Sequence, residues 1–275
     1  MAIGQTVVNK KEEAKKSAID DIAFEDLFTP ATEIKAGKGL KIGIYGRAKV
    51  GKSHFALTFP KGIIYVIDTE GAIKTNVQVL DDTFKSRIKV FEVMQYSSSL
   101  EEEGDMDFSE TLKVLEKAIR KTIAANKGKE DVTLVVDSAT DMWDWLSIWV
   151  TDEAEGVKHI AGGDKVNRLE WGKPNKRYTR MIDNLVRSGC NVIMTFRAKP
   201  MVDSQGCDVG VDTARWQKNT DYKLDLIVHM VKVGKERTLK FDGGRYGDNI
   251  PELKDPSWPK LLKHLETHSG VKIDH

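Results

Sequence analysis

The sequence has little of several features that mark specialised classes of protein. Only two of its 275 residues are cysteines, Cys190 and Cys207, which is too few for a disulfide framework, and no Cys/His cluster has zinc-site spacing. No run approaches the ~18 consecutive apolar residues that a membrane-spanning helix needs. The N-terminus also has no apolar signal-peptide core. We therefore expect reduced thiols, no membrane association and a cytoplasmic location.

The chain also has no large excess of positive or negative charge. The 43 Lys and Arg residues nearly balance 42 Asp and Glu residues, so the formal net charge is +1. Long-range attraction to nucleic acid is therefore excluded, and any DNA binding must come from a local basic patch. With 31% charged and 40% hydrophobic residues, the composition is that of a soluble globular protein.

The pattern of the chain changes near residue 38. Residues 1–37 are polar and charged, and we expect them to form a flexible N-terminal arm. In residues 38–275, short apolar β-rich runs alternate with helical stretches, which predicts one α/β domain with a mostly parallel sheet covered by helices. The expected strands are residues 40–45, 63–67, 88–93, 132–136 and 191–195, and the expected helices are residues 109–125 and 169–187.

The last third of the chain has a different pattern. Residues 224–233 and 237–241 flank Gly234-Lys235-Glu236 and predict an antiparallel hairpin that extends the sheet. Residues 258–265 predict a final helix after two prolines.

A complete phosphate-binding loop occupies residues 46–53, which read Gly-Arg-Ala-Lys-Val-Gly-Lys-Ser. It follows an apolar strand and opens a helix, which is the context that this motif requires. Loop N–H groups would hold the β-phosphate, Lys52 would bridge the β- and γ-phosphates, and Ser53 would bind magnesium. ATP and Mg²⁺ are therefore the expected ligands. The predicted nucleotide-binding residues are Gly46, Arg47, Ala48, Lys49, Val50, Gly51, Lys52, Ser53 and His54.

Two further apolar strands end in carboxylates. Residues 133–137 read Thr-Leu-Val-Val-Asp, as a Walker B strand does, and we expect Asp137 to hold magnesium through water. Residues 65–71 read Tyr-Val-Ile-Asp-Thr-Glu-Gly and end the strand after the P-loop helix. A carboxylate there could orient the attacking water. The alternative is that Asp68 and Glu70 are exposed turn residues.

The Ile-Asp-Thr-Glu-Gly stretch at this place resembles the RecA and RadA recombinase core, and the resemblance covers about residues 38–250. It implies a RecA-like P-loop fold in which Glu70 is the catalytic base. The stretch from Glu170-Trp171-Gly172 to residue 195 is similar to a phage-encoded branch of RecA-like ATPases that includes Sak-type single-strand annealing proteins. Where that class commonly has a Gln sensor of the γ-phosphate, this chain has Thr195-Phe196-Arg197, so either Thr195 or Arg197 could serve.

The same resemblance implies assembly into a homo-oligomer. RecA-like ATPases often complete the site with a Lys or Arg of a neighbouring subunit near the final hairpin, which suggests Lys240 and Arg245, with surface salt bridges as the alternative. The segment Phe28-Thr29-Pro30-Ala31 resembles the Phe-x-x-Ala oligomerisation motif of RadA-type recombinases. In that motif an extended segment adds to the sheet of the next protomer.

Two segments lie where RecA-like proteins carry DNA-binding loops. Residues 158–180 have seven Lys or Arg against two acidic residues, a local charge of +5, and include Trp171 and Tyr178. Such a segment suits single-stranded nucleic acid, although a solvated helix with both aromatic rings in the core is the alternative. Residues 199–218 are long, polar and expected to be structureless. Candidate DNA contacts are Lys158, Lys165, Arg168, Lys199, Arg215 and Trp216, of which Trp216 could instead pack on the sheet.

These features favour an ATP-dependent protein of the RecA-like class that binds single-stranded DNA and acts in phage DNA annealing or recombination. A single-strand-binding protein is a candidate partner. The alternative is a P-loop ATPase switch or loader that acts on a protein partner without contacting DNA. A packaging or transport motor is disfavoured, because we find no second ATPase module and no conventional helicase motif set.

Overall fold

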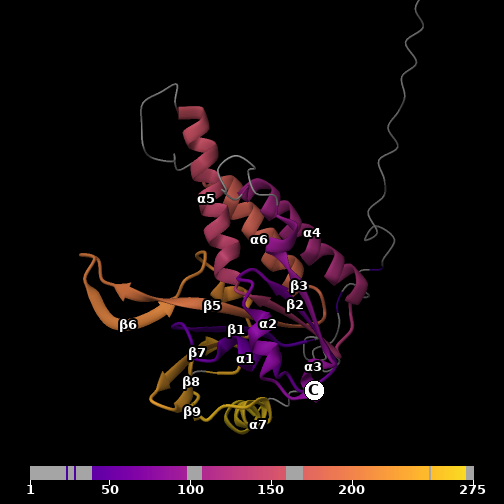
Figure 1. Cartoon of the computed structure of the whole chain (residues 1–275). Helices are drawn as coiled ribbons and strands as arrows, with labels where there is room; N and C mark the ends of the chain where they lie inside the picture. Colours follow the sequence, from indigo (N-terminus) through magenta and orange to yellow (C-terminus); the bar gives the residue numbers. More distant parts are fainter. Residues whose placement is uncertain are drawn as a thin grey trace, which may run out of the picture. The chain divides into compact units, whose positions relative to one another are not determined.

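A central β-sheet forms the middle layer of the fold, and helices pack on it (Figure 1). The computed structural model describes residues 39–97, 107–158, 170–247 and 249–270, together with Ala23 and Phe28, so the predicted arm of residues 1–37 lies almost entirely outside the description. The strands are β1 (Lys41–Gly46), β2 (Ile63–Asp68), β3 (Ile88–Glu92), β4 (Val132–Asp137), β5 (Asn191–Val202), β6 (Asp208–Ala214), β7 (Leu226–Val233), β8 (Glu236–Gly244) and β9 (Leu253–Lys254). Their order in the sheet is β3-β2-β4-β5-β1-β7-β8-β9, with β6 paired to β5.

Six neighbouring strands, from β3 to β7 in the sheet order, run parallel. All six residues of β1 and all six of β4 are buried, because helices cover the sheet on both faces. The register sets Asp68 opposite Asp137 and Gly46 opposite Arg197. The carboxyl ends of β2, β4, β5 and β1 therefore meet at one edge. This confirms the predicted α/β class with a mostly parallel sheet.

The antiparallel end of the sheet is also as predicted. Strands β7 and β8 pair around the turn at Gly234, whose φ of 60° is in the left-handed region, and β9 pairs antiparallel with β8. Glycine adopts this conformation without strain, which explains why the chain reverses there. Strand β8 starts one residue earlier and ends three residues later than the sequence predicts.

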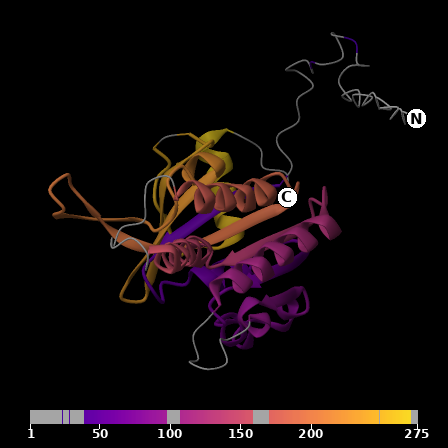
Figure 2. The same ribbon diagram turned by 90° about the horizontal axis from the view of Figure 1, so that it is seen from above.

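The prediction of a structureless segment at residues 199–218 was wrong. Strand β5 continues past Thr195 to Val202 and pairs antiparallel with β6, so that most of the segment is a β-hairpin, which projects from the sheet in Figures 1 and 2. The two strands pair with each other, and β6 is mostly exposed. They therefore need no long apolar run, which is the signal that identified the other strands.

Helices cover both faces of the sheet. They are α1 (Lys52–Leu57), α2 (Ile73–Gln78), α3 (Asp82–Lys85), α4 (Phe108–Asn126), α5 (Ala139–Lys158), α6 (Gly172–Val186) and α7 (Trp258–Ser269), with 3-10 turns η3 (Val93–Tyr96) and η4 (Asp221–Lys223). One core layer packs α4, α5 and α6 on the sheet, and the other packs α1, α2 and α7. The predicted helices at residues 109–125, 169–187 and 258–265 correspond to α4, α6 and α7. Within the described residues, no helix is both long and apolar enough to cross a membrane.

Trp258 packs the C-terminal helix α7 against α1, the helix that follows the P-loop. Its side chain is 1% exposed, and its Nε1 donates to the Phe55 carbonyl oxygen at 2.7 Å. The ring stacks on Phe55 and meets Phe59 edge-on, with centroid distances of 4.4 and 4.8 Å. The packing of α1, the helix that follows the P-loop, therefore depends on a residue about 200 positions further along the chain.

We expect Trp258→Ala to lower the free energy of unfolding by about 3–5 kcal/mol, because it leaves a cavity where a large buried ring was packed. Urea denaturation followed by circular dichroism measures this loss. Tyr222→Ala, at an aromatic side chain that is 79% exposed, is the control and should change stability by no more than about 0.5 kcal/mol. Equal losses in the two variants would contradict the anchoring role of Trp258.

Candidate functional site

The P-loop connects β1 to α1 and requires glycine at both ends of its motif. A Cβ atom on Gly46 would lie 2.3 Å from the Met230 carbonyl oxygen of β7. Gly51 has a φ of 110°, and a Cβ there would lie 2.9 Å from Nε of Arg237. Lys49 also adopts a left-handed conformation, with a φ of 63°. The loop is thus held in a curved form that suits an anion-binding loop of backbone N–H groups.

Lys52 lies across this loop. Its Nζ donates to the carbonyl oxygens of Gly46 and Arg47, both at 2.9 Å. Burial lowers the pKa of Lys52, while the nearby charges of Asp137 and Glu70 oppose that shift. The ammonium group is therefore placed between the loop and the carboxylates, where a phosphate chain would supply the opposite charge.

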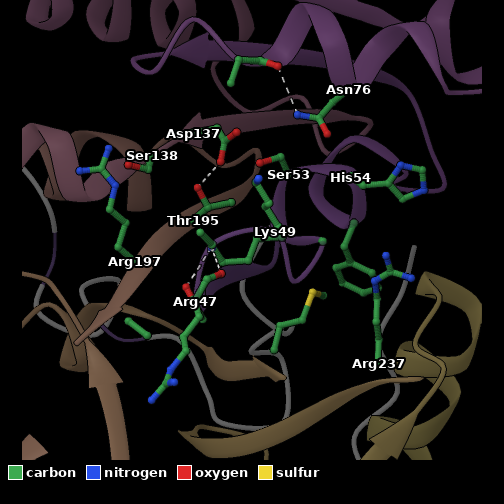
Figure 3. A pocket seen from close by; sticks show the side chains of 18 of the residues that line it. Arg47, Lys49, Ser53, His54, Asn76, Asp137, Ser138, Thr195, Arg197 and Arg237 are labelled. Atoms are coloured by element: carbon green, nitrogen blue, oxygen red, sulfur yellow. Dashed lines mark hydrogen bonds between the residues drawn. The ribbon is translucent and has the colours of Figure 1, made fainter. Parts of the chain in front are cut away.

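Asp137 ends β4 as a buried carboxylate at the carboxyl edge of the sheet (Figure 3). It is 3% exposed, and burial raises its pKa, although hydrogen bonds from the hydroxyls of Thr195 and Ser53 act in the opposite direction. Within the described part of the chain, no Lys or Arg nitrogen lies within 4.0 Å of this carboxylate, so no ion pair balances its charge. A carboxylate and a hydroxyl in contact are ligands that Mg²⁺ prefers, and the residues therefore fit that ion.

The two carboxylates at the end of β2 differ in what they contact. Asp68 is fully buried, and its carboxylate accepts the backbone N–H groups of Glu70, Gly71 and Ile73 at 3.1, 2.8 and 3.1 Å. It therefore shapes the turn. Glu70 instead faces the cleft, where its Oε1 accepts Nε and Nη2 of Arg197 at 3.2 and 2.8 Å.

Arg197 is the centre of an ion-pair network beside the P-loop. In addition to Glu70, it contacts Asp141 at 2.8 Å and Asp144 at 3.7 Å, and both belong to α5. Arg215, just after β6, contacts Asp144 at 3.0 Å. The network therefore joins the end of β2, the start of α5 and both strands of the projecting hairpin.

The P-loop, Glu70, Asp137 and Arg197 line one cleft of about 1270 Å³. Its walls are Gly46, Arg47, Ala48, Lys49, Gly51, Lys52, Ser53, His54, Phe55, Glu70, Ala72, Asn76, Asp137, Ser138, Thr195, Arg197, Ala198, Pro200, Asp212, Met230, Arg237 and Pro256. Every predicted nucleotide-binding residue lines the cleft except Val50. That side chain is buried, but its carbonyl oxygen accepts Nε of Arg237 at 3.0 Å.

The sequence did not point to several residues of this cleft, including Asn76, Asp212, Arg237 and Pro256. Asp212 of β6 accepts Nε and Nη2 of Arg47 at 2.7 and 3.0 Å, which ties the hairpin to the P-loop. None of the four belongs to a motif or follows a buried parallel strand. No signal in the sequence could have found them without the strand order.

The other predicted site residues lie in different places. Thr195 lies in the cleft and donates to Asp137, whereas Lys240 contacts Glu252 and Arg245 contacts Asp225, both at 3.2 Å and outside the cleft. Ala31, Lys165 and Arg168 lie outside the described residues, as does the side chain of Lys158; Phe28 is described without its motif partner. Their roles stay predictions.

The aromatic residues of the two predicted DNA segments pack inward. Trp216 meets Phe196 edge-on with centroids 5.0 Å apart, so the alternative in which Trp216 packs on the sheet describes the structure. Tyr178 is 1% exposed and in the core, while Trp171 is partly buried beside Trp143. The candidate contact Lys199 is exposed on β5, outside the cleft.

The fold and the site together define a P-loop ATPase with a mostly parallel sheet. Residues 38–247 match the family described as AAA domain (AAA_24). Because that match covers well over half of the 275 residues, the chain belongs to this family.

Solved structures resemble the chain at low sequence identity. The crystal structure of the RadB recombinase is 17% identical over 79% of this chain and 87% of that one, with a TM-score of 0.47. The type III secretion ATPase EscN of enteropathogenic E. coli, in complex with its central stalk EscO, is 17% identical over 72% of this chain, with a TM-score of 0.43. The match covers 43% of the EscN chain. No curated protein sequence matches.

The buried charge of Asp137 predicts a pH-dependent cost in the magnesium-free protein. Because its pKa is raised on folding, the free energy of unfolding falls as the pH rises through that pKa. Asp137→Asn cannot ionise. We expect it to melt at a higher temperature than the wild type at about pH 8 with EDTA present, with the gap closing toward about pH 4.

Scanning calorimetry across this pH range measures that gap. Asp131→Asn, at an exposed position, is the matched control and should follow the wild type at every pH. An Asp137→Asn protein that melts below the wild type at about pH 8 would show that the buried charge carries no such cost.

Proposed function

We propose that this ATPase binds single-stranded DNA and uses ATP to control annealing or recombination, in the manner of the phage RecA-like proteins that its motifs resemble. The observation that carries the proposal is a basic face on α6. Lys173, Lys176 and Arg180 are exposed or partly exposed and three to four residues apart, which places them on one side of the helix. None of them forms an ion pair with another described residue. Such cations are available to phosphates.

The opposite face of α6 fixes its orientation. Tyr178, Met181, Ile182 and Leu185 are buried against the sheet and its neighbouring helices, so the basic face has to point to solvent. Tyr178 cannot stack on a base from this position. The proposed DNA contact is therefore mainly electrostatic in the described part of the segment, with Lys158, Lys165 and Arg168 as further candidates.

The ion-pair network would couple the nucleotide cleft to the basic segment through α5. Helix α5 begins two residues after Asp137 and carries Asp141 and Asp144, both bound to the Arg197 that holds Glu70. Any movement of Glu70 toward a water molecule at the γ-phosphate would break or rearrange these pairs. The far end of α5 leads along the chain to the basic segment.

In the hydrolysis step, each residue has a distinct task. Lys52 and the P-loop N–H groups would hold the phosphates, and Ser53 and Asp137 would hold Mg²⁺, which supplies charge neutralisation at the phosphate oxygens. Glu70 would orient the attacking water and accept its proton. Arg197 keeps Glu70 in place before ATP binds, and Thr195 positions the Asp137 carboxylate.

A neighbouring subunit is part of the same proposal. Lys240 and Arg245 lie outside their own cleft and are candidates to reach the site of another protomer. Phe28 and Ala31 would supply the contact between protomers. Their role rests on the sequence motif alone.

A second candidate function is a switch or loader for a protein partner, because the β5–β6 hairpin suits protein better than DNA. Residues 199–214 contain one Lys and three Asp, a net charge of −2, which repels phosphates. Its exposed apolar side chains, each 45–56% accessible, are Met201, Val202, Val209 and Val211. An apolar, acidic arm tied to the nucleotide cleft is what a partner-binding element requires.

Glu70→Gln should bind ATP as the wild type does and hydrolyse it about 10²- to 10⁴-fold more slowly, because the amide cannot accept a proton. Phosphate release and binding of a fluorescent ATP analogue separate the two effects. Lys52→Ala should lose binding itself. Glu92→Gln, on neighbouring β3 and outside the cleft, is the matched control and should retain activity. Turnover by Glu70→Gln at the wild-type rate would remove Glu70 as the base.

Replacing Lys173, Lys176 and Arg180 together by Ala should weaken binding to a labelled oligothymidylate and reduce the slope of log affinity against log salt by about 2, at ~0.7 for each phosphate that is no longer neutralised. Fluorescence anisotropy with and without ATP measures both. The control replaces three exposed lysines away from α6, which are Lys254 of β9 and Lys260 and Lys263 of α7.

The outcome also separates the two candidate functions. Salt-sensitive binding that depends on the α6 face supports the DNA proposal. Absence of salt-sensitive binding by the wild type would remove that proposal, leave the ATPase intact and favour the protein partner.

A further inference from the structure

The cleft continues past the P-loop, away from its catalytic carboxylates. Figure 3 shows His54 and Arg237 on the side of the pocket opposite Arg197 and Ser138. Pro256 and Asn76 also line the cleft. These residues come from α1, β8, the segment before α7 and α2, which are parts of the chain that the nucleotide motifs do not include, His54 apart.

Arg237 is held against the loop by its backbone and its side chain. Its carbonyl oxygen accepts the N–H of Asp255 at 2.8 Å, which places the neighbouring Pro256 beside it. Its Nε donates to the Val50 carbonyl oxygen at 3.0 Å, and Gly51 has no Cβ to displace it. No carboxylate of the described residues forms an ion pair with Arg237. The rest of its guanidinium is therefore available to a ligand.

His54 lies next to this guanidinium, directly after Ser53. The His54 side chain lines the same cleft as Arg237. The backbone behind it is fixed, because Trp258 binds the Phe55 carbonyl. This end of the cleft is thus lined by the guanidinium of Arg237, the imidazole ring of His54 and Pro256, which are flat surfaces that suit a planar heterocycle.

The direction of a bound nucleotide follows from the P-loop. Lys52 and Ser53 define where the phosphates lie, and Asp137, Glu70 and Thr195 mark the end where the terminal phosphate reacts. The nucleoside must leave the loop on the other side, where His54 and Arg237 lie (Figure 3).

We propose that His54, Asn76, Arg237 and Pro256 form a nucleobase subsite that selects adenine, with the Arg237 guanidinium stacked on the base. A guanidinium stacks on aromatic faces and does so better than the point charge of a lysine. The Asn76 Nδ2 donates one N–H to the Ala72 carbonyl oxygen at 3.3 Å. Its second N–H and its carboxamide oxygen are the donor and acceptor pair that matches the N6 and N7 edge of adenine. This proposal rests on the P-loop nucleotide site and adds the specificity of that site.

The nucleobase subsite can be tested with two ligands that both contain a triphosphate. Isothermal titration of the full chain with Mg-ATP and with inorganic triphosphate compares a ligand that has a base with one that lacks it. We expect Arg237→Ala to weaken ATP binding about tenfold and to leave triphosphate binding unchanged. Arg237→Lys should recover only part of the loss. Lys235→Ala, in the exposed turn two residues earlier, is the control and should bind both ligands normally.

The following results would contradict the proposed subsite. Equal weakening of ATP and triphosphate would make Arg237 a phosphate ligand, and no weakening of either would exclude it from the site. Asn76→Ala should reduce the preference for ATP over GTP, and an unchanged preference would remove the assigned base contact. A wild type that binds neither ligand would overturn the P-loop site itself, which distinguishes that failure from failure of the subsite. A melting temperature equal to that of the wild type shows that Arg237→Ala is folded.

Discussion

Parallel pairing of β2, β4, β5 and β1 is the constraint on which the nucleotide site depends. Parallel strands bring their carboxyl ends to the same edge, and neighbouring strands lie about 4.8 Å apart. The register places Asp68 opposite Asp137 and Gly46 opposite Arg197. The P-loop and two acidic strand ends, which lie far apart in the chain, therefore share one cleft. A slip of one residue in any pair would turn these side chains to the opposite face.

Electrostatics divides the carboxylates at this edge into structural and chemical groups. Asp68 is buried but accepts three backbone N–H groups, so its polar atoms are satisfied by the turn that it shapes. Asp137 is buried with only two hydroxyl donors, and it forms no direct ion pair with a described Lys or Arg. Such a group destabilises the protein alone and is stabilised by a bound metal ion. The protein itself therefore satisfies Asp68, whereas the surroundings of Asp137 fit a bound cation.

The ion pairs around Arg197 join that cleft to α5 and to the β5–β6 hairpin. The side chains of Arg197 and Glu70 are 45% and 33% exposed, so that pair contributes little to stability, whereas Asp141 is 8% exposed. Several carboxylates compete for the same guanidinium, however, and the loss of one partner changes the others. Glu70, α5 and the β5–β6 hairpin are therefore linked through one ion-pair network. Such a link suits a protein that reports its nucleotide state to a partner.

The sequence by itself determined the parts of this protein that are local. Glycines at fixed spacing, a lysine and a serine identify the P-loop, and buried parallel strands appear as apolar runs ending at Asp137 and Glu70, because each signal lies within about ten residues. The tertiary structure alone decided which distant side chains meet them. Arg197 reaches Glu70 across 127 residues, and Arg237 reaches Val50 across 187. The β5–β6 hairpin was also hidden, because its strands pair with each other and bury little apolar surface. Strand order and register created these contacts, and neither leaves a local pattern in the chain.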